Sequence, residues 1–327
     1  MKLIIQIPCF NEAETLPVAL KELPRSVPGF TSVEWLIIND GSTDGTEKVA
    51  RAHGVDHIIN LTKNKGLARG FLAGLDACVK LGADVIVNTD ADNQYMAADI
   101  PLLTAPILAG TSDVVIGTRP IDAIDSFSPL KKLLQKAGSA VVRFVSQTAV
   151  PDAPSGFRAM TREAAMRFNV FNDYTYTLET IIQAGQKNIA ITSVPVRVNR
   201  ELRPSRLVTS IPAYIRKSVI TIFRIFVVYK AFRFFMSVGL CAAGLGFLVG
   251  IRFLYYYISG EGDGHLQSLI LASILLGGGF QTMLTAFLAD LLAVNRRLME
   301  DVQYRVKKLE ISVDQTATEE PTHTIRE

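Results

Sequence analysis

The sequence predicts an α/β protein with a mostly parallel sheet, followed by a two-helix membrane hairpin. Over about the first 200 residues, short apolar runs rich in β-branched residues alternate with stretches of helical spacing. This alternation is typical of a sheet whose faces are covered by helices. Further along, residues 234–251 and 269–289 contain no charged side chain. Each run is near the length that crosses about 30 Å of hydrocarbon as a helix.

The elements of the α/β part are expected in the following order. Strands are predicted at residues 3–7, 35–39, 57–61, 85–88, 113–117 and 189–198. Helices are predicted at residues 12–23, 44–53, 66–81, 130–147 and 162–168. Because parallel strands end at the same edge of a sheet, the loops that follow these strands are expected to share a site. We expect this domain to cover residues 1–204.

The C-terminal part is predicted to lie on and in the inner (cytoplasmic) membrane. Residues 205–232 are basic and amphipathic, as in helices that lie in the membrane interface. Spans are predicted at 233–258 and 266–294, joined by an external loop at 259–265 without Lys or Arg, and followed by a polar tail at 295–327 whose last part is expected to be disordered. The positive-inside rule then places both termini and the α/β domain in the cytoplasm. A buried helical hairpin in a soluble core is the alternative.

Composition adds little to this interpretation. The cysteines Cys9, Cys78 and Cys241 lack metal-ligand spacing and are expected to be reduced, packed thiols. The net charge of +3 gives no indication of a nucleic-acid partner. Basic residues are concentrated between Arg203 and Arg233, where they favour contact with anionic lipid headgroups. A solvated helix face is the alternative.

Acidic residues follow three of the predicted strands. Glu12 follows the first strand, Asp40 the second, and Asp90 with Asp92 the fourth. Two carboxylates one residue apart repel each other unless a cation joins them, and Mg²⁺ commonly takes one or two carboxylates together with substrate phosphates. A loop with two solvated aspartates is the alternative. Helix capping accounts for Asp44 but leaves Asp40 without a structural role.

Five motifs occur in order along the chain, namely Pro8-x-x-Asn11-Glu12, Asp40-Gly-Ser-Thr-Asp-Gly-Thr46, Asp90-Ala-Asp92-x-Gln94, Gly117-Thr-Arg119 and Ser155-Gly-Phe-Arg158. Together they resemble the family 2 glycosyltransferases of the GT-A fold, in particular the polyprenyl-phosphate branch that includes dolichyl-phosphate mannose synthases. The resemblance covers roughly residues 1–206, and the hairpin matches bacterial and some archaeal members. It implies inverting, metal-dependent transfer of one sugar from a nucleotide sugar, with UDP favoured, to a polyprenyl phosphate at the cytoplasmic face.

The resemblance also implies roles for single residues. Asp92, helped by Gln94, would bind Mg²⁺ or Mn²⁺. Asp92, Asp152 and Arg119 would be the catalytic residues. The donor would be bound by Pro8, Phe10, Glu12, Asp40, Asp90, Ala91, Arg200 and Arg206. The acceptor phosphate would be bound by Arg119, Arg143 and Ser155.

Physical chemistry supports part of this assignment and leaves alternatives. A lipid phosphate is already ionised, so it needs cationic positioning rather than a strong general base, and arginine suits phosphate well. Arg143 can instead lie on a solvated helix face, and Asp152 can orient a substrate or only cap a turn. Pro204 and Arg206 replace the glycine and lysine that other members often have, which keeps the charge but stiffens the loop.

Two other functions compete with this one. A processive polysaccharide synthase of the same superfamily would have more spans and a Gln-x-x-Arg-Trp motif, which the sequence lacks. A membrane anchor that only binds a nucleotide or a partner is disfavoured by the intact acidic motifs.

Homo-oligomers through the juxtamembrane or transmembrane helices are a further expectation, because Ala242, Gly246 and Gly250 repeat every four residues.

Overall fold

The computed structural model of the chain describes residues 1–121, 129–170, 176–199, 216, 220, 223–224, 227–260 and 262–319. It divides into two compact units. The first comprises Met1–Val219 and Val302–Glu327, and the second Ile220–Asp301. Arg200, Arg206 and most of the predicted interfacial segment 205–232 lie outside the described residues.

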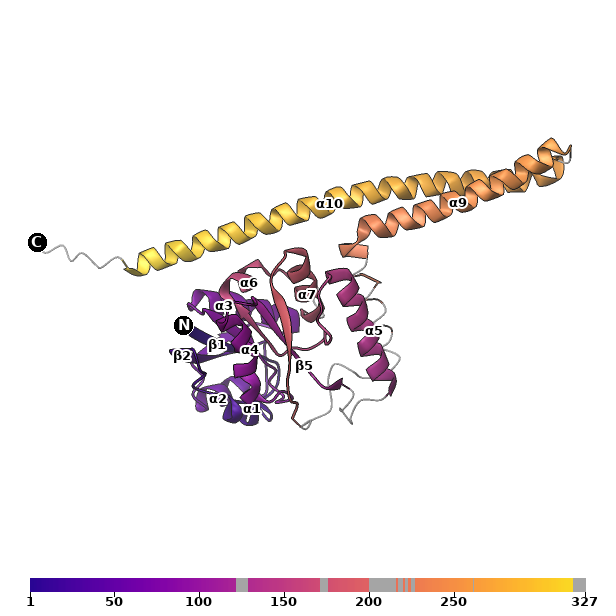
Figure 1. The fold of residues 1–327 in the computed structure, drawn as a ribbon. Helices are drawn as coiled ribbons and strands as arrows, with labels where there is room; N and C mark the ends of the chain where they lie inside the picture. The colour runs from indigo at the N-terminus through magenta and orange to yellow at the C-terminus, as the bar shows by residue number, and fades with distance from the viewer. Residues whose placement is uncertain are drawn as a thin grey trace, which may run out of the picture. The chain divides into compact units, whose positions relative to one another are not determined.

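The first unit contains a seven-stranded, mostly parallel sheet, which confirms the predicted α/β class (Figure 1). Only β6 is antiparallel to its neighbours, β4 and β5, whereas the other pairs are parallel. In spatial order the strands are β3 (His57–Asn60), β2 (Ser32–Asn39), β1 (Lys2–Cys9), β4 (Val85–Asn88), β6 (Arg158–Thr161), β5 (Val114–Thr118) and β7 (Ile191–Pro195).

Strand β6 is not predicted by the sequence, because it is only four residues long and begins with a charged residue. Its direction matters for the site. Arg158, at the start of β6, pairs with Asn88 at the end of β4 and with Ile116 near the end of β5. The loop that precedes β6 therefore reaches the edge of the sheet where the parallel strands end.

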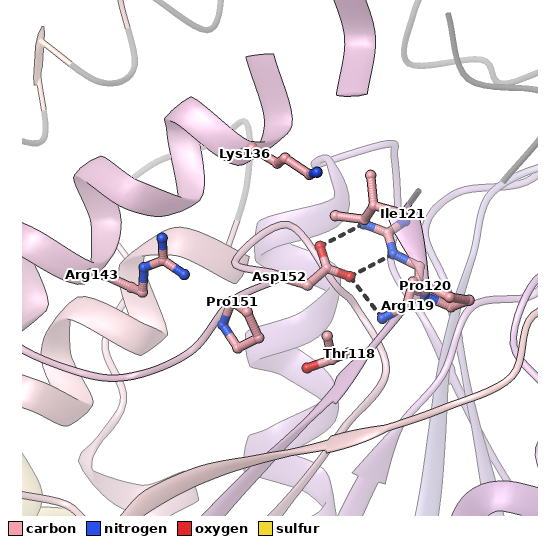
Figure 2. Close-up of a pocket in the computed structure, with 8 residues that line it drawn as sticks. All are labelled: Thr118, Arg119, Pro120, Ile121, Lys136, Arg143, Pro151 and Asp152. Atoms are coloured by element: carbon pink, nitrogen blue, oxygen red, sulfur yellow. Dashed lines mark hydrogen bonds and ion pairs between the residues drawn. The ribbon is translucent and has the colours of Figure 1, made fainter. Parts of the chain in front are cut away.

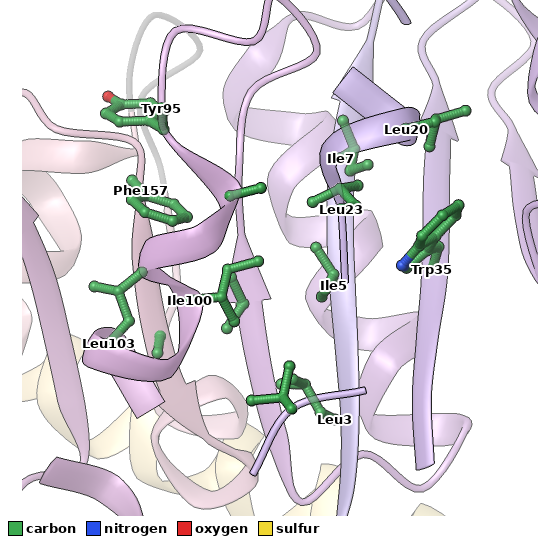
Figure 3. Close-up of a cluster of buried hydrophobic side chains, with 14 of the residues drawn as sticks. Leu3, Ile5, Ile7, Leu20, Leu23, Trp35, Tyr95, Ile100, Leu103 and Phe157 are labelled. Atoms are coloured by element: carbon green, nitrogen blue, oxygen red, sulfur yellow. The ribbon is translucent and has the colours of Figure 1, made fainter. Parts of the chain in front are cut away.

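Helices cover both faces of the sheet. On one face, α1 (Leu16–Glu22), α2 (Thr46–Ala52) and α4 (Ile100–Leu108) form one core with Leu3, Ile5 and Ile7, alternate residues of β1 (Figure 3). On the other face lies α3 (Leu67–Lys80), where a Cβ atom on Gly74 would collide with Gln6 of β1. Among the described residues, this unit also contains α5 (Pro129–Ser146), α6 (Arg162–Arg167), α7 (Thr177–Gln186) and the end of α10, and α5 packs against α7.

The five helices predicted for the α/β part are present in the structure, with ends shifted by up to four residues. The sequence does not predict α4 or the short 3₁₀ turn η1 (Ala97–Asp99) before it. The α4 segment Ile-Pro-Leu-Leu-Thr-Ala-Pro-Ile-Leu is apolar almost throughout and contains two prolines, so it shows no helical period.

The second unit is built from α9 (Ala231–Ile258), the 3₁₀ turn η3 (Gly262–His265) and the larger part of α10 (Leu266–Glu319). By length and composition, α9 and α10 can each cross a membrane. Small residues bring the two helices together. A Cβ atom on Gly239 would lie 2.9 Å from the Gly279 carbonyl oxygen, and one on Gly246 would lie 2.9 Å from Leu275 Cβ.

Disorder is expected only for about the last twenty residues of the polar tail, and this expectation is wrong for those up to Glu319, where helix α10 ends. No proline interrupts the chain between residues 266 and 319. Apolar and charged residues also alternate there at helical spacing, and Arg296 and Glu300 form an i,i+4 ion pair. Within the first unit, the Tyr304 hydroxyl donates a hydrogen bond to Glu163 of α6.

Candidate active site

The loops that follow β1 and β2 are joined by side-chain hydrogen bonds. Asn11 adopts a left-handed φ of 54°, and its N–H donates to Ser42 Oγ at 2.9 Å. In return, Asn11 Oδ1 accepts from the N–H of Thr43 at 2.8 Å. Asp44 Oδ2 accepts from the N–H of Ala13 at 3.0 Å. The first two sequence motifs thus form one wall at the carboxyl edge of the sheet.

Asp40 has a structural role that the sequence analysis did not recognise. It is buried, and its two carboxylate oxygens accept from the backbone N–H groups of Lys65 at 2.7 Å and Gly66 at 2.8 Å. These residues lie directly before α3, so Asp40 fixes the loop that starts this helix. Gly41 follows with φ 71°, and a Cβ atom there would lie 2.6 Å from the Asn64 nitrogen. Contact of Asp40 with a donor remains a prediction.

Other predicted donor residues lie at the same edge. Phe10 is exposed, Pro8 is partly buried and Ala91 is buried. Glu12 is buried too, and its Oε2 accepts from the Thr15 hydroxyl at 2.5 Å. The ends of β1, β2 and β4, which are neighbours in the sheet, therefore bring these residues together as the sequence predicts.

Asp90 and Asp92 lie on the turn after β4, and both are partly buried. Asn93 has a left-handed φ of 57°, and Asp92 Oδ1 accepts from the N–H of Gln94 at 3.2 Å. Burial, followed by the negative charge of Asp92, raises the pKa of Asp90 to about 7, while the charges of Arg119 and Arg158 act in the opposite direction. The charges of the two arginines therefore do not cancel the effect of burial and of Asp92 on Asp90.

This donor set fits a divalent cation that shares its ligands with a substrate. Among the described residues, no group of three or more His, Cys, Asp or Glu side chains is placed to hold a metal ion. Mg²⁺ does not need such a cage, because it usually binds one or two carboxylates together with substrate phosphates and water. Asp90 and Asp92 supply that number of carboxylates, and a cation there would relieve their repulsion.

Gly156 explains part of the Ser-Gly-Phe-Arg motif. A Cβ atom at this position would lie 3.0 Å from Asp90 Oδ2 and 3.1 Å from the hydroxyl of Tyr176. The backbone of Gly156 is held in place on both sides: its N–H donates to Tyr95 Oη at 2.9 Å, and its carbonyl accepts from Asn88 Nδ2 at 2.9 Å. A residue without a side chain is needed because the backbone passes directly beside the Asp90 carboxylate.

Arg119 and Asp152 form a buried, two-pronged ion pair (Figure 2). Arg119 donates from Nε to Asp152 Oδ2 at 2.8 Å and from Nη2 to Oδ1 at 3.0 Å. The Arg119 backbone N–H donates to the same carboxylate at 3.2 Å. Burial alone lowers the pKa of Arg119, but Tyr95, Asp152 and Asp90 together raise it above its usual value. Asp152 therefore fixes the orientation of Arg119, a role that the sequence does not reveal.

A cavity of about 500 Å³ lies beside this ion pair. Lys136 and Arg143 of α5 point toward it from one side, and Arg119 with Asp152 lies on the other (Figure 2). The structure thus brings Arg143 near Arg119, as predicted, and adds Lys136, which the sequence analysis did not select. The signal was present, since Lys136 and Arg143 are seven residues apart and share a helix face.

Ser155, predicted to contact the acceptor, does not line this cavity. It is fully buried, and its hydroxyl has no hydrogen-bond partner in the described part of the chain. Its carbonyl oxygen accepts from Nη2 of Arg158, which is also fully buried and donates from Nη1 to Thr180 Oγ1 at 2.6 Å. Arg158 thereby ties the loop before β6 to α7, another role that the sequence analysis missed.

The last described residues before position 200 run alongside the Asp92 loop. The N–H of Asn199 donates to the Gln94 carbonyl oxygen at 2.8 Å. The backbone N–H of Arg197 donates to Asp99 Oδ2 at 2.7 Å, and its guanidinium pairs with the same carboxylate. The backbone at residue 199 therefore contacts the predicted metal ligand Gln94 directly.

Comparison with known proteins identifies the family. The family model described as glycosyl transferase family 2 matches residues 4–168. The polyprenol monophosphomannose synthase of Mycolicibacterium smegmatis is 26% identical over 216 residues, which cover 62% of this chain and 80% of the relative. The undecaprenyl-phosphate mannosyltransferase of Micrococcus luteus is 27% identical over 218 residues, which cover 63% of this chain and 88% of the relative. Glycosyltransferase AglJ of Haloferax volcanii is 25% identical over 307 residues, which cover 91% of this chain and 96% of the relative.

Solved structures agree on the fold. Glucosyl-3-phosphoglycerate synthase from Mycobacterium tuberculosis is similar with a TM-score of 0.55 and 20% identity, over 68% of this chain and 79% of that one. This likeness concerns the fold alone, and it confirms the predicted GT-A architecture. Because the family model matches just over half of the 327 residues, the protein belongs to glycosyl transferase family 2.

Proposed function

We propose that the protein transfers one sugar, with inversion, from a nucleotide sugar to a polyprenyl phosphate at the cytoplasmic face of the membrane. The donor site is formed by Phe10, Glu12, Asp40 and the Asp90–Asp92 turn, and the acceptor phosphate binds in the cavity beside Arg119. UDP is the favoured nucleotide. The product is a polyprenyl-monophosphate sugar.

In the donor half, Asp92, helped by Gln94, would hold Mg²⁺ or Mn²⁺ together with the donor diphosphate, and Asp90 would bind the donor. The bound cation supplies positive charge for the departing nucleoside diphosphate. In support, the pKa of Asp90 stays raised beside the negative charge of Asp92, and a solved structure of the fold-related glucosyl-3-phosphoglycerate synthase contains Mn²⁺ and UDP. The basic residues Arg200 and Arg206 assist in binding the donor.

In the acceptor half, the cations of the cavity bind and orient the lipid phosphate. An oxygen of this phosphate attacks the anomeric carbon of the sugar as the bond to the nucleoside diphosphate breaks, so the configuration inverts. The attacking oxygen is already ionised, so no side chain has to remove a proton from it. Arg119 is suited to this task because Asp152 holds its guanidinium in one orientation.

The single observation that carries the proposal is the charged cavity itself. Three cations, Arg119, Lys136 and Arg143, surround a space of about 500 Å³ next to the acidic turn. Arg119 is close enough to Asp90 for each to shift the pKa of the other. A phosphate acceptor matches this charge, and two relatives are named for polyprenol and undecaprenyl-phosphate substrates. The apolar helices α9 and α10 support a membrane location for such an acceptor.

The test is a screen of UDP- and GDP-linked sugars with the purified full chain, a short polyprenyl phosphate and Mg²⁺ or Mn²⁺. The expected product is a glycolipid whose mass equals the lipid phosphate plus one sugar residue. Chelation of the metal should stop the reaction, and Asp92→Ala should abolish it without changing the emission of Trp35, the only tryptophan. Release of nucleotide without a glycolipid, for every donor tested, would contradict the proposal.

A further inference from the structure

Helix α5 has three distinct faces. Its buried face includes Gln135, Ser139, Val142 and Ser146, which follow one another at intervals of three or four residues. This face holds the site together, because Ser139 Oγ accepts from the N–H of Ala153, next to Asp152, at 3.2 Å. The other two faces carry an apolar stripe and a row of cations.

The face opposite the buried one is an exposed apolar stripe. Leu130, Leu133, Ala137, Val141 and Phe144 recur every three or four residues along the whole helix. Leu133 is 64% exposed and Phe144 is 67% exposed. Residues of this size are seldom left in water in a continuous row, so the stripe indicates a binding surface.

A row of cations runs along one flank of this stripe. Lys132, Lys136 and Arg143 lie at intervals of four and seven residues, and the last two line the cavity. The 18-residue helix contains three lysines and one arginine but no acidic residue. A helix with a Leu and Phe face beside a Lys and Arg face is typical of segments that lie at the surface of a membrane.

We propose that α5 is a lipid-docking helix, which inserts its apolar stripe between the headgroups of an anionic bilayer. The cation row then lies at the level of the phosphates, where Lys and Arg are attracted to anionic lipids. A protein partner fits less well, because lysine is depleted at protein interfaces. This contact is made by the α/β unit itself, in addition to any contact made by the apolar helices or the basic segment before them.

Docking of α5 would determine how the acceptor enters. Lys136 and Arg143 line the cavity and also belong to the cation row, which borders the stripe. With the stripe docked, we expect a lipid phosphate to reach Arg119 while its hydrocarbon chain stays in the bilayer. This consequence rests on the proposed function, whereas the docking itself does not. The two can therefore be tested separately.

Docking is tested by the depth of spin labels in the full chain, reconstituted into vesicles that contain phosphatidylglycerol. Cys241→Ala removes the exposed cysteine, and Leu133→Cys or Phe144→Cys introduces the label. Leu102→Cys is the matched control, because Leu102 is 50% exposed on α4, which packs against β5 and β6, whereas α5 packs against α7. Labels at 133 and 144 should be more accessible to oxygen than to a water-soluble nickel complex, and the label at 102 should show the reverse. Equal behaviour of all three labels would overturn the proposal.

The effect of docking on acceptor entry is tested by the double variant Leu133→Glu with Phe144→Glu. The KM for a polyprenyl phosphate embedded in vesicles should rise about tenfold, whereas the KM for a short, water-soluble isoprenyl phosphate in detergent should not change. Leu102→Glu should change neither value. An unchanged KM for the embedded lipid would refute the role of docking in acceptor entry. If no variant, and not even the natural chain, transferred sugar, the proposed function would fail while the label depths still reported on docking.

Discussion

The folded protein should lose stability as pH rises, because of Asp90, and Asp90→Asn should remove this loss. Burial and the charge of Asp92 raise the pKa of Asp90 from its ordinary value of 3.8 to about 7. Between these two pH values the folded chain keeps a proton on Asp90 that the unfolded chain has released. The folded state therefore binds more protons, and the free energy of unfolding falls as pH increases from about 4 to about 7.

The size of the effect follows from the same two values. The ordinary and the raised pKa of Asp90 differ by about three units, and each unit corresponds to about 1.4 kcal/mol. The loss in the free energy of unfolding therefore has an upper limit of about 4 kcal/mol. Solvent reaches the partly exposed carboxyl and reduces the cost, so we expect a loss of about 2–4 kcal/mol between pH 4 and pH 8. Asp90→Asn should be more stable than the natural chain by this amount at pH 8 and should lose the advantage near pH 4.

The assay is urea unfolding of the full chain in detergent with EDTA, followed by tryptophan emission. Trp35, the single tryptophan, is buried in the core of the α/β unit and reports on that unit alone. Glu14→Gln is the control, because it removes an exposed carboxyl and should change stability by less than about 0.5 kcal/mol at either pH. Mg²⁺ or Mn²⁺ should stabilise the natural chain at pH 8 and have a smaller effect on Asp90→Asn. An advantage of Asp90→Asn that is equal at pH 4 and pH 8 would refute the reasoning.

Three further changes test the neighbouring contacts. Asp152→Asn leaves a buried guanidinium without its counter-charge and should cost about 3–5 kcal/mol in the same unfolding assay; a cost below about 1 kcal/mol would contradict the ion pair. Gly156→Ala places a methyl group 3.0 Å from a carboxylate oxygen and should raise the KM for the nucleotide sugar, whereas Gly138→Ala, with no atom within 4 Å of the new methyl group, should not. Lys136→Met should raise the KM for the lipid phosphate about tenfold without changing the KM for the donor, since one charge-assisted contact is worth about 1.5–3 kcal/mol; parallel changes in both constants would argue against a role confined to the acceptor.

The order of strands and helices was largely predictable because each element has a local signature. Buried runs such as Val85–Asn88 show themselves by their β-branched residues, and the polar residues that follow them had to gather at one edge of a parallel sheet. Strand β6 could not be predicted, because four residues are too few to show an alternating pattern. Its strand conformation depends on pairing with β4 and β5, between which it lies.

Side-chain roles were less predictable, because the deciding partners are distant in sequence. Asp40 is held by N–H groups 25 and 26 residues away, and Asp152 by Arg119, 33 residues away. Local patterns such as helix caps involve separations of only three or four residues, so they cannot indicate such pairs. Lys136 is a different case, because it lies seven residues before Arg143 on the same helix face, and this spacing is visible in the sequence.

The antiparallel direction of β6 accounts for the coupling between the two halves of the site. A loop that enters β6 arrives at the edge where β4 and β5 end, so Gly156 meets Asp90 and Asp152 meets Arg119. A parallel strand at this position would carry the same loop to the opposite edge, and Arg119 would lose its buried partner.

Both substrates of the proposed reaction are anionic, so the site must hold two phosphate groups close together. Asp152 neutralises part of the Arg119 charge but also fixes its direction, and Lys136 and Arg143 restore positive charge around the cavity. We therefore expect the acceptor to depend on these two cations of α5 as much as on Arg119 itself.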